Sequence, residues 1–153
     1  MKLSAQEEYG LRCLIRVGRD GSATIPGLSR AEGISEPNAA KMMRLLRRRG
    51  FVLSTRGASG GYALARPADQ IVIGQVLAAL GGRLFEASFC DRHAGVQPLC
   101  AHMGDCSIRP VWRMIQDAVD QVLDRMTLND LLCNEQQMSG WPASHPASLP
   151  TYS

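Results

Sequence analysis

The feature of the sequence that most constrains the fold is a glycine-rich stretch, Gly-Ala-Ser-Gly-Gly at residues 57–61, between two short segments with strand character. Residues 51–56 and 62–66 form these flanks, and each flank ends in an arginine. Glycines between two such segments predict a β-hairpin with a tight turn. Because glycine lacks a Cβ, the tip of such a hairpin can also approach a phosphate or a minor groove closely. The glycines are therefore interpreted as a tight turn, as the tip of a DNA-contacting wing, or as both.

Two short helices are predicted immediately before this hairpin. Thr24 is an N-cap type and Gly33 a C-terminal stop, which predicts a helix between them. Ser35 is a second N-cap for a helix that ends near Gly50. Two short helices separated by a tight glycine-containing turn predict a helix-turn-helix.

The second of these helices carries polar residues at steps of three and four, which places them on one face. Taken alone, this face is either an ordinary solvated surface or a DNA-reading surface, and the basic hairpin that follows favours DNA. The expected base-reading residues are Ser35, Glu36 and Asn38, the expected contacts to phosphates or base edges are Lys41, Arg44, Arg47 and Arg48, and the expected wing contacts are Arg56, Gly60, Gly61 and Tyr62.

Charge is distributed unevenly along the 153 residues, although the net charge is only +3. Residues 1–66 carry twelve Lys and Arg against five Asp and Glu, whereas residues 67–153 carry five against nine. A basic front half joined to an acidic back half predicts a nucleic-acid-binding head attached to a different module. No nucleophile–base pair or phosphate-binding loop is apparent, so we expect neither an enzyme nor a small-molecule substrate.

The remainder of the chain is predicted to be mainly helical. A first helix begins at the capping-box pair Ser4 and Glu7, and a fourth helix covers about residues 71–80. Apolar residues from Ile108 onward alternate at spacings of four and three, which predicts a long helix packed against a partner helix, and Thr127 can cap a short last helix. The predicted fold is a winged helix-turn-helix domain (1–82), a cysteine loop (83–107), a dimerisation helix with a short terminal helix (108–135) and a disordered tail (136–153).

Five cysteines are expected to be reduced, because the sequence begins with no signal region, contains no membrane span and is interpreted as cytoplasmic. Cys90, Cys100 and Cys106 lie in one loop without the tight Cys-x2-Cys spacing of structural zinc sites, which favours an iron–sulfur cluster over zinc. Cys13 and Cys133 are expected to be buried structural thiols. Candidates for a fourth ligand, among which the residues alone favour a histidine, are His93, His102, Asp91, Asp105 and Glu8.

Several motifs together resemble the Rrf superfamily of winged-helix regulators, which includes the IscR and NsrR types. They cover roughly residues 1–133 and read YGLR at 9–12, ISEP at 34–37, LRRRGFV at 46–52, RGASGGYALARP at 56–67 and IRPVW at 108–112. The resemblance implies a homodimer that binds a pseudo-palindromic operator in double-stranded DNA. It also implies that a 2Fe-2S or 4Fe-4S cluster on Cys90, Cys100 and Cys106 controls this binding.

The resemblance also bears on the fourth ligand. Glu8 matches the carboxylate that NsrR-type members supply from the other subunit, whereas the IscR-type histidine position holds Arg109. Glu8 is therefore favoured, ahead of His102 and His93. The gap between the first two cysteines is longer than is usual, and Asn38-Ala39-Ala40 departs from the usual recognition helix. The alternative is a cluster-free repressor that responds to thiol chemistry or to a metal.

Overall fold

A winged helix-turn-helix head and one long helix make up most of the protein. The computed structural model describes residues 3–57, 60–86 and 88–144. The head consists of α1 (Ala5–Asp20), α2 (Ile25–Glu32), α3 (Glu36–Arg48), β1 (Val52–Thr55), β2 (Gly61–Leu64), the 3-10 turn η1 (Ala68–Gln70) and α4 (Ile73–Gly81). It is followed by α5 (Phe89–Arg92), α6 (Ile108–Leu123), α7 (Leu128–Leu131), α8 (Glu135–Ser139) and α9 (Trp141–Ser144). This mainly helical architecture with a two-stranded hairpin confirms the predicted fold class.

Local capping explains where the helices of the head begin and end. Ser4 and Glu7 form the reciprocal capping box at the start of α1. The Thr24 side chain accepts a hydrogen bond from the Gly27 backbone N–H at 3.1 Å, and Ser35 caps α3 in the same manner. Gly33 ends α2 with a left-handed φ of 64°, a conformation that glycine adopts without steric cost. These predicted caps are confirmed.

The core of the head forms where α1, α3 and α4 pack together. Leu14 and Val17 of α1 are fully buried, as are Met43 and Leu46 of α3. Leu128 of α7 is also fully buried, so the chain returns to the head after α6 and completes its core. Burial of such side chains is the main stabilising contribution to the fold, at roughly 1.5–3 kcal/mol each.

The hairpin is attached to the head at a third position besides its two chain connections. β1 and β2 pair antiparallel from Val52 opposite Leu64 to Thr55 opposite Gly61. The outer edge of β2 forms a bridge to the chain between α1 and α2: Ala23 N–H donates to the Tyr62 carbonyl at 2.9 Å, and Tyr62 N–H donates to the Ala23 carbonyl at 2.8 Å. The wing is therefore bonded directly to the helix-turn-helix.

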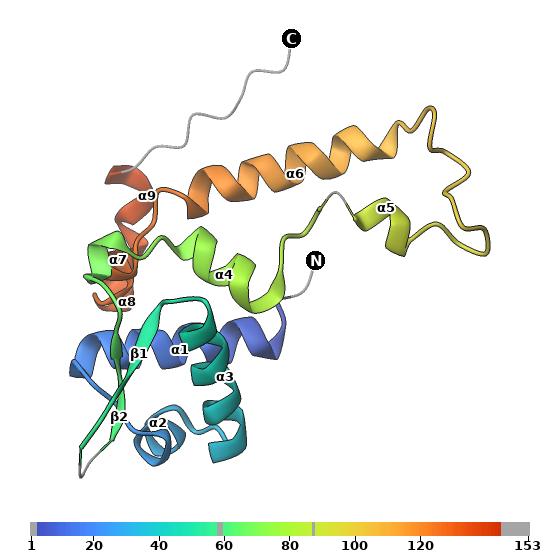
Figure 1. Cartoon of the computed structure of the whole chain (residues 1–153). Coiled ribbons are helices and arrows are strands. Elements are labelled where there is room, and N and C mark those ends of the chain that lie inside the picture. The colour runs from blue at the N-terminus through green and yellow to red at the C-terminus, as the bar shows by residue number, and fades with distance from the viewer. Residues whose placement is uncertain (1–2, 58–59, 87, 145–153) are drawn as a thin grey trace.

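The long helix α6 extends beyond the head, with α4 beneath its C-terminal part (Figure 1). The chain between α4 and α6, called the cysteine segment below, leads into its N-terminal end. Much of its apolar surface is not covered by the chain itself. Ile108 is 54 % exposed, Trp112 40 % and Val122 40 %. Among the described residues, no helix is both long enough and apolar enough to cross a membrane.

Two predictions for the second half of the chain require correction. The segment 83–107 was predicted to be a loop, but it contains the single helical turn α5. Residues 136–144 were expected to be disordered, but α8 begins with a capping box from Asn134, and Met138 and Trp141 line an apolar pocket together with Val122 of α6. The prediction of disorder for residues 145–153 lies outside the described residues.

Candidate DNA-binding surface and cysteine segment

The outer face of α3 carries the residues predicted to contact DNA. Pro37 lies in its first turn, and the opposite face is buried through Ala39, Met42, Met43 and Leu46. Because those four residues fix the rotation of the helix, the polar positions point outward. The predicted contact residues that are exposed on and around α3 are Ser35, Glu36, Asn38, Lys41, Arg44, Arg47 and Arg48.

The wing residues divide into outward-facing and structural groups. Arg56 and Gly60 are exposed at the end of the hairpin. A Cβ on Gly61 would lie 2.7 Å from the Ala23 carbonyl oxygen, so the bridge to the head requires glycine there. Tyr62, predicted to contact DNA, is half-buried and packs against the core. The Arg66 guanidinium lies 5.3 Å from the ring centre of Phe51, so it packs against the head.

A cluster of charged residues joins α1 to α2. The Glu32 carboxylate accepts hydrogen bonds from Arg12 Nε at 3.2 Å and from Arg16 Nε at 2.9 Å. Arg12 also donates to the backbone carbonyl of Glu32. The Glu32 side chain is only 13 % exposed, so solvent screens these pairs less than it screens surface pairs. The charge cluster fixes the position of α2 relative to α1.

The three cysteines of the segment before α6 are half-buried free thiols. Cys90 lies on α5, Cys106 directly precedes the N-cap residue of α6, and Cys100 lies between them. Nowhere in the described parts of the chain do three or more His, Cys, Asp or Glu side chains come close enough together to hold a metal ion. The chain thus places the three thiols in one segment without gathering them around a single point.

The other two cysteines differ from these three. Cys13 is fully buried, as predicted, and burial raises the pKa of its thiol to about 11, with a further contribution from the Glu32 carboxylate. Cys133 was expected to be buried but is half-buried, and its thiol donates to the Asp130 carbonyl at 2.8 Å. The high pKa keeps Cys13 protonated and therefore a poor nucleophile and metal ligand.

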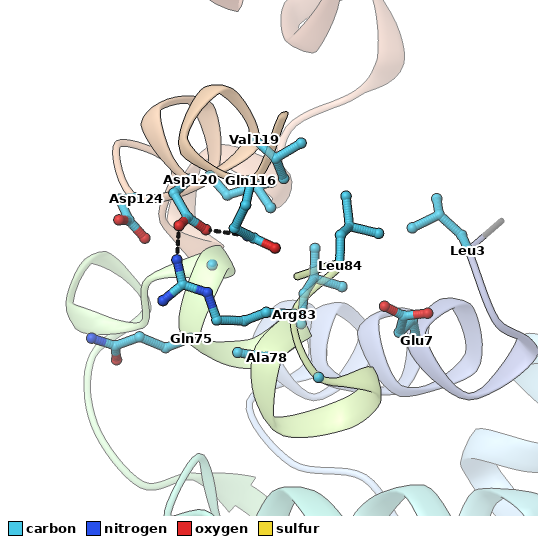
Figure 2. Close-up of a pocket in the computed structure, with 14 residues that line it drawn as sticks. Leu3, Glu7, Gln75, Ala78, Arg83, Leu84, Gln116, Val119, Asp120 and Asp124 are labelled. Atoms are coloured by element: carbon cyan, nitrogen blue, oxygen red, sulfur yellow. Dashed lines mark hydrogen bonds and ion pairs between the residues drawn. The ribbon is translucent and has the colours of Figure 1, made fainter. Parts of the chain in front are cut away.

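Gln116 on α6 holds the start of the cysteine segment. It is only 5 % exposed, and its Oε1 accepts the Phe85 backbone N–H at 2.9 Å. Its Nε2 donates to Asp120 Oδ1 at 2.7 Å, and Asp120 in turn pairs with Arg83. Figure 2 shows Gln116, Asp120 and Arg83 at one side of a groove of about 550 Å³, which Glu7 of α1 and Ala78 of α4 also line.

An aromatic group holds α5 beside the N-terminal part of α6. The Phe89 ring lies 6.4 Å from Trp112 and 5.3 Å from Phe85, measured between ring centres. The His93 ring stacks on Phe89 at 4.2 Å, and its Nδ1 lies 2.8 Å from the Phe89 carbonyl oxygen. The sequence predicted His93 as an alternative fourth ligand but did not indicate its pairing with Cys90 on α5. The Cys-x2-His spacing is the signal that identifies this pair.

The other candidate fourth ligands lie apart from this group. Glu8 is exposed on α1, next to Glu7, which packs over Gly81 at the end of α4. His102, Asp91 and Asp105 are exposed in the cysteine segment. Within one chain, Glu8 therefore belongs to the head and the two histidines to the segment before α6.

The basic face of α3, the helix-turn-helix and the attached hairpin define a winged-helix DNA-binding protein. Residues 3–134 match the family model of Rrf2, described as an iron-dependent transcriptional regulator. The chain belongs to the Rrf2 family, and it is a transcriptional regulator and not an enzyme. The protein named rrf2 from Nitratidesulfovibrio vulgaris is 36 % identical over 86 % of this chain and 87 % of its own length. IscR from Pectobacterium carotovorum is 29 % identical over 89 % of this chain and 82 % of its own.

Solved structures agree with this assignment. CymR of B. subtilis, titled the global cysteine regulator, aligns with a TM-score of 0.67 at 30 % identity, covering 86 % of this chain and 96 % of its own. IscR of T. potens aligns with a TM-score of 0.67 at 29 % identity and covers 86 % of each chain. The similar structures thus include both an IscR and a CymR.

Proposed function

We propose that the chain is a transcription regulator whose affinity for its operator is set by an iron–sulfur cluster held on Cys90, Cys100 and Cys106. The observation that carries this proposal is the concentration of three free, half-buried thiols in the single segment that leads into α6. Thiolates are the usual ligands of such clusters, which spread over several atoms and tolerate wide cysteine spacings. The relatives named IscR and the iron-dependent description of the family support the same assignment.

The donor set fits such a group in its chemistry. Three thiolates need a fourth ligand, and the candidates are Glu8 of the partner subunit and the chain's own His93 and His102. Both 2Fe-2S and 4Fe-4S clusters are compatible with these donors. When bound, the cluster would supply a centre that is sensitive to iron–sulfur status, oxidants or nitric oxide.

In this proposal the chain binds DNA as a homodimer. The exposed residues Ile108, Trp112 and Val122 lie on one seam of α6 and are suited to pack against the same helix of a second copy. Two copies of α3 would then enter successive major grooves about one helical turn apart, on a pseudo-palindromic site.

Coupling between the two sites would run through the parts of the chain that connect them. Gln116 ties residues 83–85 to α6, and the charge cluster of Arg12, Arg16 and Glu32 ties α1 to α2. A shift in the cysteine segment would thus reach the helix-turn-helix through α6, α4 and α1, because α6 packs on α4 and α4 packs on α1. Coupling of this kind changes operator affinity by about 5- to 150-fold.

Anaerobic purification tests the cluster directly. We expect iron and sulfide in the coloured protein, and their loss when Cys90, Cys100 and Cys106 are all changed to Ser. Operator footprints of the two proteins should differ. A colourless wild-type protein whose footprint matches that of the triple variant would overturn the proposal.

The DNA-binding surface has a separate test. Arg48→Ala should weaken binding to all sequences and lower the slope of log affinity against log salt by about one unit, because one phosphate contact is lost. Arg113→Ala removes an exposed arginine of α6 and should change neither quantity. Equal effects of Arg48→Ala and Arg113→Ala would show that DNA does not bind at the exposed face of α3.

A cluster-free, thiol- or metal-responsive regulator is the second candidate. It is favoured by the separation of the three thiols within the described residues of one chain. A similar structure, titled as the oxidized form of Staphylococcus aureus CymR, also favours it and is 26 % identical over 88 % of this chain. This candidate predicts a colourless protein whose operator affinity still changes when the three cysteines become Ser.

A further inference from the structure

We propose that His93, through Nε2, is the fourth protein ligand of the metal or cluster site, next to Cys90. This inference rests on the function proposed above, because it concerns the group that the three cysteines hold. It assigns the fourth position to the chain that carries the thiols, and leaves Glu8 outside the coordination sphere.

The backbone of α5 places Cys90 and His93 together. The two residues are three positions apart around a single helical turn, and the His93 N–H donates to the Cys90 carbonyl at 3.2 Å. Residues three apart on a helical turn share one face. Asp91 and Arg92 are adjacent to this pair in sequence but project in other directions, and Arg92 pairs with Glu86. Ligand pairs at positions i and i+3 of a helix are a spacing that metal sites use.

The hydrogen bond of the His93 ring fixes which nitrogen is available. Nδ1 lies 2.8 Å from the Phe89 carbonyl oxygen, and a carbonyl can only accept, so Nδ1 carries the proton. In the neutral ring the lone pair is then on Nε2, on the far side from the carbonyl. Metal-binding histidines are oriented in this way, with the other nitrogen donating to a carbonyl or carboxylate.

Stacking holds the ring in this orientation. The His93 and Phe89 rings lie 4.2 Å apart at 21°, and Phe89 is itself packed near Trp112 of α6. Both histidines of the segment, His93 and His102, are exposed, but of the two only the His93 ring makes a ring contact and a hydrogen bond within the part of the chain that the structure describes. Of the two, His93 is the imidazole whose ring is held in place, so less entropy is lost when it binds a metal.

The remaining two thiols belong to the chain between α5 and α6, and binding a common centre would require this loop to bring them to the pair. Met103 N–H donates to the Cys100 carbonyl at 3.1 Å, and Arg109 of α6 donates to the Met103 carbonyl at 3.3 Å. The loop is therefore anchored to the first turn of α6, and Cys106 lies just before the N-cap residue of this helix. All four donors belong to one continuous segment that begins and ends against α6.

Cobalt titration of the reduced full-length protein tests the ligand without any activity assay. Co²⁺ bound by thiolates gives sulfur-to-metal charge-transfer absorption, and its d–d bands report the coordination. We expect His93→Ala to weaken Co²⁺ binding at least about tenfold and to change the d–d bands. His102→Ala is the matched control, and both it and Glu8→Ala should behave as wild type.

Pulsed EPR of the reduced, reconstituted cluster gives a second readout. Wild type and His102→Ala should show the nitrogen coupling of a bound imidazole, and His93→Ala should lose it. Retention of this coupling in His93→Ala, or loss of Co²⁺ binding in Glu8→Ala alone, would overturn the inference while leaving the cluster intact. Protein that takes up neither iron nor sulfide would refute the proposed cluster instead, and the Co²⁺ titration would still decide the role of His93.

Discussion

Single residues show how this chain assigns different roles to chemically identical thiols. Cys13 is enclosed by the core of the head, whereas Cys90, Cys100 and Cys106 are half-buried outside it. Enclosure disfavours the thiolate, because a charge in an apolar environment loses its hydration. Position in the fold therefore separates the enclosed thiol from the three that we propose as cluster ligands.

Cys13 makes the stability of the protein depend on pH in the alkaline range. Its pKa is raised from 9.0 to about 11 in the folded protein, so between these pH values the unfolded chain loses the proton and the folded chain keeps it. Deprotonation then favours unfolding, and the free energy of unfolding should fall by about 2–3 kcal/mol across this range. Urea unfolding of wild type and Cys13→Ala at several pH values isolates this contribution. Parallel pH profiles for the two proteins would contradict it.

Gln116 is the residue whose loss should loosen the cysteine segment without unfolding the head. In Gln116→Leu the Phe85 amide loses its acceptor, and its hydrogen exchange should accelerate about fivefold, as expected for one hydrogen bond. Alkylation of Cys90 should also become faster, while that of the enclosed Cys13 should not. Gln75→Leu, an exposed position that lines the same groove on α4, is the matched control. Equal exchange in both variants would show that Gln116 has no such role.

Secondary-structure elements differ in how far the sequence predicts them. α1, α2 and α3 begin at the predicted caps Ser4, Thr24 and Ser35, because a cap is a local interaction between neighbours in the chain. The exposed face of α3 followed from the periodicity of its apolar residues. These signals located the helix-turn-helix and its predicted DNA-reading face.

Short elements that depend on distant contacts were not predictable in the same way. α5 is a single turn held by Phe89 against Trp112, and α8 packs beside α6 through Met138. α5 and α8 have only four and five residues, which is too short for a periodic pattern of apolar residues to be recognised. The network of Gln116 was equally hidden, because its partners Phe85 and Asp120 meet it only in the folded chain.

The hairpin provides a prediction at the level of elements. Gly61→Ala places a Cβ 2.7 Å from the Ala23 carbonyl oxygen, so β2 must move away from the head. We expect the free energy of unfolding to fall by about 1–3 kcal/mol, as for other overpacked sites. Gly60→Ala is the control, because a Cβ on Gly60 would lie 3.4 Å from its nearest neighbour, the Thr55 carbonyl oxygen, which is an ordinary contact distance. Denaturant midpoints that match for the two variants would exclude this close contact as the reason for the glycine.

At the scale of the whole molecule, much of the apolar surface of α6 is left uncovered. α6 carries Ile108, Val111, Trp112, Met114 and Val122 as exposed apolar side chains. Contiguous apolar surface of this kind marks a site of protein association. None of these five side chains is buried in the core of the head, so they can be changed without removing a core residue.

Trp112→Glu should separate the proposed dimer into monomers with an intact head. A charge at the centre of an apolar seam weakens association at least about tenfold. Sedimentation at several protein concentrations should show a lower mass, and circular dichroism should show the helical content of wild type. Asp117→Lys changes charge on the same helix away from the seam and should leave the mass unchanged. A dimer of wild-type affinity in Trp112→Glu would assign the contact to another surface.

The paired hydrogen bonds between Ala23 and Tyr62 have a consequence for the energetics of recognition. They hold the strands of the wing and the start of α2 in one fixed arrangement before DNA binds. Ordering these strands then costs no conformational entropy at the moment of contact, so more of the interaction with phosphates and bases appears as net affinity. Weakening this bridge should therefore lower operator affinity by making complex formation entropically costlier, even though neither backbone group need touch DNA.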